Sequence, residues 1–281
     1  MCADGVQTNG LSLTISLGER RFRVDMDNPY DLSIPLKFGG PQPNVFGAPQ
    51  AATTPLLSGA FIGDTRVGGN CNCQSITLTP HCNGTHTECA AHIVDDAYSI
   101  RDMGIEAFMP STLVTVSPEV RPIEDADRTR HPVISDRMIR AAIRNSDPAF
   151  NKALIIRTLP NSASKRLQVY DAPSTPFLTV EAVDFICGKG FQHLLVDLPS
   201  IDPLDDGGAL AAHRCFWGLN DRAVGMSRTG RGGTTITELI YVPNDVPEGL
   251  YLLNLQIAPF VSDATPSRPV IFSVKEANIQ L

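Results

Sequence analysis

Residues 179–196 read TVEAVDFICGKGFQHLLV, and this stretch decides the fold class. Thr179 can cap a helix whose apolar side chains recur at helical spacing, and Gly188 ends that run. A short apolar run at residues 194–196 follows at once, and a similar run at residues 153–156 precedes the helix. Strand, helix and strand in this order indicate a crossover unit of an α/β fold.

The rest of the chain fits one domain of this class. Residues 11–24 alternate around a turn, which predicts a hairpin. Ser135 or Asp136 can cap another helix, and residues 209–217 predict a third. Further strands are predicted at residues 234–242, 250–257 and 270–274. Because the sequence shows no repeat and no linker, we predict a single domain over residues 1–281, with an N-terminal hairpin extension at residues 1–27.

Residues 39–63 are rich in glycine, proline and alanine and show little apolar periodicity. Long loops without secondary structure are uncommon in compact domains, and they often form lids, pocket walls or partner contacts. We therefore predict a long loop of this kind here. The sequence leaves open whether it covers its own site or that of a neighbouring chain.

Composition excludes several classes of partner. The formal net charge is -7 and the pI about 5.3, so the basic surface that nucleic acids require is missing. The N-terminus is polar and has no secretory h-region. The most apolar stretch, residues 250–261, is too short and too polar to span a bilayer. We expect a soluble, cytoplasmic protein that binds neither nucleic acid nor membrane.

The seven cysteines predict reduced thiols, because their number is odd and the chain is much longer than small disulfide-stapled folds. Cys71 and Cys73 are separated by one residue and have no second pair to complete a zinc knuckle. A structural zinc site on them is a minor alternative. Cys82 and Cys89 lie close to histidines and are either small buried residues or thiols that line a pocket.

A cluster of histidines carries the candidate chemistry. Three of the six histidines, His81, His86 and His92, lie close together with Glu88. A turn at residues 83–84 lets the first two rings converge, and an extended strand would point His86 and Glu88 to the same face. Two imidazoles and a carboxylate suit Zn²⁺ or Mn²⁺ and leave positions for water. His92 would act on that water; the alternative is a set of separate, hydrogen-bonded histidines.

The segment from His81 to His92 resembles the signature of the cyclase family of metal-dependent hydrolases, which includes bacterial kynurenine formamidases and isatin hydrolases. That signature is a histidine, then Gly-Thr-His, an acidic residue two positions later and a histidine four beyond it. Other segments are similar to the family in the same order, so the resemblance covers residues 28–274. They are Asp31-Leu32-Ser33 with Pro35, residues 196–203, His213, Thr237-Glu238-Leu239, and residues 259–269 with Asp263, Pro266 and Arg268.

The resemblance implies the family's swivelling β/β/α domain, a mixed sheet with flanking helices, as a homodimer or homotetramer. It also implies one or two divalent ions per chain, Zn²⁺ in the first place or else Mn²⁺. The implied ligands are His81, His86 and Glu88 for one ion, and His213 and Glu238 for a second ion that Glu88 bridges. His92 would be the general base or proton shuttle.

The sequence departs from the family pattern at four places. Glu88 stands where most members have aspartate, and four residues separate His81 from His86 where formamidases commonly have three. Ala90 replaces the usual proline. Residues 220–233 form an insertion rich in glycine and arginine between the two later implied ligands. These departures bear on metal geometry and on the substrate.

The implied reaction is hydrolysis of a carbon–nitrogen amide bond by metal-activated water. The first choice of substrate is an aryl formamide such as N-formylkynurenine, an intermediate of tryptophan catabolism, or a related cyclic amide. A bound divalent ion lowers the pKa of its water from about 15.7 to roughly 7. A histidine, whose ordinary pKa lies near neutrality, can take the water proton and return it to the leaving nitrogen.

Two aromatic residues are candidates for substrate binding: Phe46 in the long loop and Trp217 beside His213. Either could stack on an aromatic ring of the substrate, and either could be plain core. Two alternative functions stay open. One is hydrolysis of an isatin-like lactam or of another small amide or ester. The other is a member of the fold that binds metal or ligand without catalysis.

Overall fold

Seven strands close into a ring at the centre of the fold, within the residues that the computed structural model describes: 12–94, 99–122, 130–172, 174–219 and 231–277. In ring order they are β17 (Ala264–Glu276), β16 (Gly249–Ile257), β9 (Met109–Val116), β12 (Ala153–Thr158), β14 (His193–Val196), β15 (Thr235–Glu238) and β8 (His86–Glu88). Strand β8 pairs with both β15 and β17, and this closes the ring. Strands β9, β12, β14 and β15 run parallel, whereas the other pairings are antiparallel.

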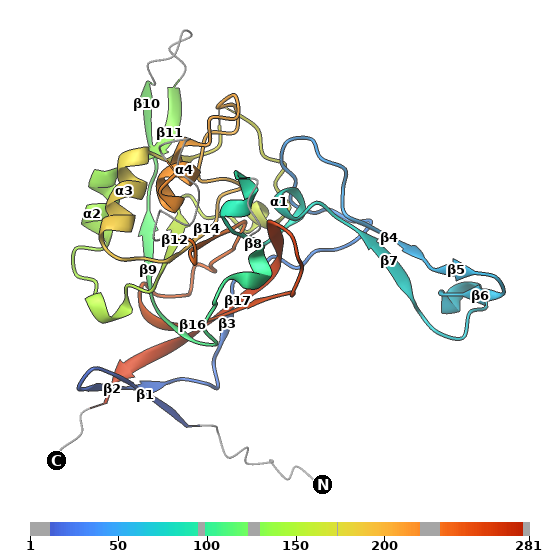
Figure 1. Cartoon of the computed structure of the whole chain (residues 1–281), viewed down its shortest axis with the longest axis horizontal. Helices are drawn as coiled ribbons and strands as arrows, with labels where there is room; N and C mark the ends of the chain where they lie inside the picture. Colours follow the sequence, from blue (N-terminus) through green and yellow to red (C-terminus); the bar gives the residue numbers. More distant parts are fainter. Residues whose placement is uncertain (1–11, 95–98, 123–129, 173, 220–230, 278–281) are drawn as a thin grey trace.

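Three helices flank one side of the ring (Figure 1): α2 (Asp136–Ala142), α3 (Val180–Gly188) and α4 (Ala211–Trp217). Strand β12 shows how the core is divided. Leu154 and Ile156 pack in the core cluster that contains the helices, whereas Ile155 between them packs in the cluster on the other face. Because side chains alternate along a strand and both faces are buried, the run is continuously apolar. The predicted α/β fold with a mixed sheet and flanking helices is confirmed.

The predicted helices are found with small changes at their ends. In α3 the Thr179 side chain accepts a hydrogen bond from Ala182 N at 3.3 Å, and the helix ends at Gly188 as predicted. Helix α2 follows Ser135, one of the two predicted caps. Helix α4 starts at Ala211, two residues later than predicted, because Leu210 adopts a left-handed conformation with φ 48°.

Strands β1 (Leu13–Leu17) and β2 (Arg20–Val24) confirm the predicted N-terminal hairpin, and β2 extends the sheet by pairing with β17. The extent of a single domain over residues 1–281 stays a prediction. The remaining short elements are β3 (Tyr30–Asp31), β10 (Glu119–Pro122), β11 (Arg130–Ile134), β13 (Phe177–Leu178), the helical turn α1 (Pro80–Asn83), and the 3-10 turns Thr65–Val67, Ala90–His92, Ile100–Asp102, Pro148–Phe150 and Ala163–Leu167. None of the helices in the described ranges has the length and apolar character needed to cross a membrane.

The prediction of a long loop without secondary structure at residues 39–63 is wrong for its second half, which belongs to a β-ribbon. Strand β4 (Ala52–Pro55) pairs with β7 (Gln74–Thr77), and β5 (Leu57–Ser58) pairs with β6 (Phe61–Ile62) near the tip. We call residues 52–77 the arm; it extends away from the body, on the side opposite the helices (Figure 1). Neither face of the arm packs on a core, so its sequence lacks the apolar alternation that predicts strands.

Candidate metal centre

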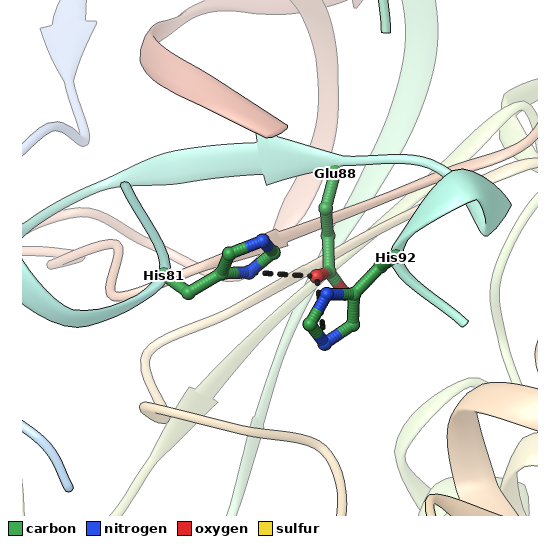
Figure 2. A group of neighbouring side chains, drawn as sticks. All are labelled: His81, Glu88 and His92. Carbon is green, nitrogen blue, oxygen red and sulfur yellow. Dashed lines mark ion pairs between the residues drawn. The ribbon is translucent and has the colours of Figure 1, made fainter. Parts of the chain in front are cut away.

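The histidine cluster lies on β8 and on the turns at its two ends. His81 is on the helical turn α1, His86 and Glu88 are on β8, and His92 ends the 3-10 turn Ala90–His92. Figure 2 shows the rings of His81 and His92 pointing toward the Glu88 carboxylate. His81 Nδ1 lies 3.1 Å and His92 Nε2 4.0 Å from Glu88 Oε2. The His81 and His86 ring centroids lie 5.1 Å apart, so the predicted convergence of these two rings is confirmed.

Glu238 and His213 reach the same carboxylate from other elements. Strand β15 pairs with β8 so that Glu238 stands opposite His86, and the two side chains approach to 3.5 Å between Glu238 Oε2 and His86 Nε2. His213 on α4 places Nε2 2.9 Å from Glu88 Oε1 and 3.5 Å from Glu238 Oε1. The other four side chains implied as metal ligands are therefore gathered around Glu88.

Each of the three imidazoles implied as metal ligands has one ring nitrogen held by an oxygen acceptor. His86 Nδ1 bonds to Gly84 O at 3.0 Å, His213 Nδ1 to Asp202 Oδ2 at 2.5 Å, and His81 Nε2 to Asp263 Oδ2 at 2.8 Å. Because a carbonyl or carboxylate only accepts, the nitrogen beside it carries the proton. The other nitrogen of a neutral ring then offers a lone pair. This arrangement is typical of metal-ligating histidines.

The lone pairs of these ring nitrogens face carboxylate oxygens inside the protein. Among the described residues, His86 Nε2 is a buried atom without a hydrogen-bond partner, and Glu238 Oε2 lies 3.5 Å from it. Burying such atoms against one another is unfavourable unless a proton or a cation lies between them. Imidazole nitrogen and carboxylate oxygen are ligands of Zn²⁺ and Mn²⁺, so this donor set fits a divalent ion.

The side chains form two groups whose ligand atoms all lie within 4.8 Å of one another: His81 with Glu88 and His92, and His86 with Glu88 and Glu238. Glu88 belongs to both groups, as a bridging carboxylate would. The division differs from the expected one, which put His81 and His86 on the same ion. The reason is that α1 brings His81 beside the His92 ring, with 4.1 Å between the stacked ring centroids.

The charges in the centre depend on one another. Burial opposes a charge on His81, but hydrogen bonds to Asp263 and Glu88 outweigh it and raise its pKa to about 10. Burial also opposes the charge on Glu88, yet the neighbouring His213 and the hydrogen bonds it receives hold its pKa well below the usual value. Hydrogen bonds from His81 and His92 lower the pKa of Asp263. The carboxylates thus stay ionised because positive charge lies among them, and either protons on the imidazoles or a divalent cation can supply that charge.

Two carboxylates that support the centre were not predicted as site residues. Asp202 accepts hydrogen bonds from His213 N and from Ala212 N, and so holds the first turn of α4 as well as the His213 ring. Asp263 accepts from both His81 Nε2 and His92 Nδ1, at 2.8 and 3.3 Å. Both lie in segments that resemble the family, and that resemblance was the only signal for them in the sequence.

The two predicted substrate-binding aromatics have different environments. Trp217 is fully buried, donates from Nε1 to Thr234 O, and lies 5.5 Å from the His213 ring. Of the two interpretations left open for Trp217, plain core is the one that fits, because its ring packs in the core behind His213 and offers no surface to a substrate. Phe46 is 62% exposed, so its role in binding stays a prediction.

The cysteines take no part in these groups. Cys71 and Cys73 are free and exposed on the arm, and Cys82 and Cys89 are buried. Neither candidate metal group among the described residues contains a thiol. The small, buried interpretation therefore holds for Cys82 and Cys89, and for Cys89 burial raises the thiol pKa to about 11. Most of the insertion at residues 220–233 lies outside the described residues.

Sequence comparisons place the chain in a known family. A sequence profile described as "Putative cyclase" matches residues 30–203, well over half of the chain. The chain belongs to this cyclase family. Similar proteins include the kynurenine formamidases of Bacillus cytotoxicus, 25% identical over 205 residues, and of Bacillus mycoides, 24% identical over 204 residues. Each alignment covers 72% of this chain and 81% of the relative.

Solved structures place the cyclase chain on the same fold. A predicted metal-dependent hydrolase from Bacillus stearothermophilus superposes with a TM-score of 0.56 at 18% identity, covering 87% of this chain and 98% of the other. An isatin hydrolase bound to the product analogue thioisatinate superposes with a TM-score of 0.60 at 14% identity, covering 88% and 93%. The swivelling β/β/α architecture expected from the resemblance is thereby confirmed.

Proposed function

We propose that this cyclase-family chain is a divalent-metal-dependent hydrolase that cleaves a carbon–nitrogen bond in a small amide. The observation that carries the proposal is the buried Glu88 carboxylate, with the free nitrogens of four imidazoles directed at it or at Glu238. The relatives named kynurenine formamidase support an amide substrate and hydrolysis outside peptide bonds.

The proposed ligands are those gathered around the shared carboxylate: His81, His86, Glu88, His213 and Glu238. A divalent ion held there makes its water acidic enough to provide hydroxide near neutral pH and polarises the substrate carbonyl. We expect zinc in the first place and manganese as the alternative, with one or two ions per chain. Glu88 is the residue that both candidate groups share.

His92 is proposed to move the proton. Its Nδ1 faces Asp263 Oδ2 at 3.3 Å, and its Nε2 faces the centre. The side chain keeps 27% of its surface exposed, so a substrate can reach it, whereas Glu88 has none exposed. His92 can take a proton at Nε2 and deliver it to the leaving nitrogen, while Asp263 holds the ring and stabilises the imidazolium.

The proposed substrate is an aryl formamide of the N-formylkynurenine type, with exposed Phe46 as the candidate contact for its aromatic ring. The test compares hydrolysis of N-formylkynurenine, isatin and a panel of simple esters by protein loaded with zinc or manganese. We expect formamide turnover that a chelator abolishes and added metal restores. If isatin were the only compound hydrolysed, the substrate class would be lactams and not formamides. If the metal-loaded protein were inactive on every compound, the chain would be a family member that binds metal without catalysis. The cytoplasmic location also stays a proposal.

The Asp202→Asn variant tests how the centre is supported. Asparagine keeps the shape but removes the carboxylate that fixes the proton on His213 Nδ1. Loss of such a supporting carboxylate typically lowers metal affinity by roughly 10–100-fold. A competition titration with a chromophoric zinc chelator measures the change.

Asp206→Asn is the matched control, because Asp206 accepts from Leu210 N and Gly208 N just before α4 and has no bond to His213. We expect the control to bind zinc like the wild type. Equal zinc affinity in Asp202→Asn and in the wild type would show that His213 needs no supporting carboxylate.

A further inference from the structure

Leu239, which follows Glu238 at the end of β15, has an unusual backbone conformation. Its φ is 53°, in the left-handed region, and its side chain is fully buried. A residue with a bulky side chain enters that region at an energetic cost, because its Cβ comes too close to the following carbonyl oxygen. Such a conformation persists only where surrounding contacts hold it. Because Leu239 directly follows a proposed metal ligand, the contacts that hold it also set the position of that ligand.

Two hydrogen bonds hold the backbone of Leu239. Its N donates to Leu198 O at 2.8 Å, and its carbonyl oxygen accepts from the Thr85 hydroxyl at 2.5 Å. Leu198 lies just after β14, and Thr85 lies just before β8. These strands are the two neighbours of β15 in the ring. The turn after Glu238 is therefore tied to the strands on both of its sides.

The Thr85 hydroxyl uses its proton and a lone pair in two different bonds. It accepts from Ile34 N at 2.8 Å while it donates to Leu239 O, and these directions are fixed because an N–H only donates and a carbonyl only accepts. Thr85 is buried, and so are the residues at both ends of these bonds. Loss of the hydroxyl would remove a partner from two polar groups in the interior, which is unfavourable.

Both ligands of one pair in the metal centre stand next to this contact. His86 directly follows Thr85, and Glu238 directly precedes Leu239. Strand register places His86 and Glu238 opposite each other, with 3.5 Å between His86 Nε2 and Glu238 Oε2. The other carboxylate oxygen of Glu238 accepts from Ile201 N at 2.9 Å. The carboxylate is thus aimed by its own hydrogen bond and by the backbone turn that follows it.

We propose that Thr85 is a positioning residue of the metal centre. Its hydroxyl holds Leu239 in the left-handed conformation and thereby fixes the Glu238 carboxylate opposite the His86 imidazole. Thr85 acts through these neighbours and touches neither the ion nor the substrate. The role concerns the candidate group of His86, Glu88 and Glu238, and it rests on the metal binding of the proposed function. Ligands must be held within a fraction of an ångström for such a site to bind tightly.

The same pair of strands contains a matched comparison. Thr87 lies two residues further along β8, is also buried, and its hydroxyl bonds to the Thr237 hydroxyl on β15 at 2.8 Å. This bond joins β8 to β15 just as the bond of Thr85 joins the start of β8 to the turn after β15. It ends on a side chain within the strand, however, and not on the backbone of Leu239. Thr87→Val therefore removes a buried hydroxyl contact without releasing the turn.

Zinc affinity, measured by competition with a chromophoric chelator, tests the proposal. Valine has the branched shape of threonine without the hydroxyl, so Thr85→Val should weaken zinc binding by roughly tenfold or more, as loss of a supporting contact typically does. Thr85→Ser keeps the hydroxyl and should bind zinc nearly as the wild type does. Thr87→Val should also bind zinc like the wild type. Urea unfolding of the three variants separates this effect from a general loss of stability, which both valine variants should show.

Crystal structures of the metal-free wild type and of metal-free Thr85→Val give a second measurement. We expect Leu239 to leave the left-handed region in the variant and the separation of Glu238 Oε2 from His86 Nε2 to increase beyond that of the wild type. This measurement needs neither metal nor substrate. If the wild-type chain bound no divalent metal, the proposed function would fail, while these structures would still show whether Thr85 positions Glu238.

Three results would overturn the role of Thr85. They are zinc affinity in Thr85→Val equal to that of the wild type, an equal loss of zinc affinity in Thr87→Val, and a Thr85→Val structure in which Leu239 and Glu238 keep their wild-type positions. A failure of Thr85→Ser to restore zinc binding would equally contradict it, because serine supplies the same hydroxyl.

Discussion

The Glu88→Gln variant is expected to lose its bound metal and to hydrolyse an aryl formamide on the order of 10³-fold more slowly, or not at all. Glu88 is the one side chain common to both candidate metal groups, and its two oxygens lie 2.9 Å from His213 Nε2 and 3.1 Å from His81 Nδ1. Glutamine removes the negative charge from the centre. Metal stabilisation of the transition state amounts to several kcal/mol, and each 1.36 kcal/mol is about tenfold in rate.

Metal per chain by inductively coupled plasma mass spectrometry and kcat/KM on N-formylkynurenine measure the effect. Glu248→Gln is the matched control, because Glu248 accepts a backbone hydrogen bond from Thr115 away from the centre. Glu88→Asp restores the residue that most family members carry, and should keep metal because it keeps the charge. If Glu88→Gln bound metal and turned over substrate like the wild type, the centre would not be built on Glu88.

The His92→Ala variant is expected to lose roughly 10²–10⁴-fold in kcat while retaining its metal, because a positioned general base contributes about that much. The remaining ligands keep their contacts, since the proposed ion binding uses the other imidazoles. Turnover with saturating substrate and metal content on the same sample separate the two effects. Because the side chain is partly exposed, added imidazole should restore part of the activity.

The outcome also decides between two arrangements of the site. His81, Glu88 and His92 form one of the candidate metal groups, so His92 could bind an ion instead of moving a proton. Loss of one equivalent of metal in His92→Ala would assign it as a ligand and contradict the proposed role. Asp263→Asn is a useful companion, because it removes the carboxylate that bonds both rings. This variant should lower turnover although the His92 side chain itself is still present.

Sequence patterns predicted the parts of the fold that local burial controls. The run at residues 153–156 is apolar at every position because both faces of β12 are buried, and Thr179 caps α3 with its own side chain. In the same way, the spacing from His81 to His92 predicted their convergence, because α1, β8 and the following 3-10 turn are formed by neighbouring residues. The strands of the arm were not predicted, because neither face of the arm is buried and its sequence therefore lacks apolar alternation.

Other features depend on residues that are far apart in the chain. Asp263 bonds His81 across 182 positions, and His213 bonds Glu88 across 125 positions. The pairing of β8 with β17 closes the ring and brings Asp263 to the centre. The role of Trp217 was left open for the same reason: its position beside His213 in the sequence does not show which side of α4 faces the core.

The sequence by itself determined the α/β class, the main helices and strands, and the cluster of imidazoles and one carboxylate around β8. It did so because periodicity, capping and short-range spacing act between residues that are close in the chain. Only the tertiary structure decided which imidazoles lie with which carboxylates in a candidate metal group, and that residues 52–77 stand away from the body. Those features follow from strand register and ring closure, which join segments that no local pattern connects.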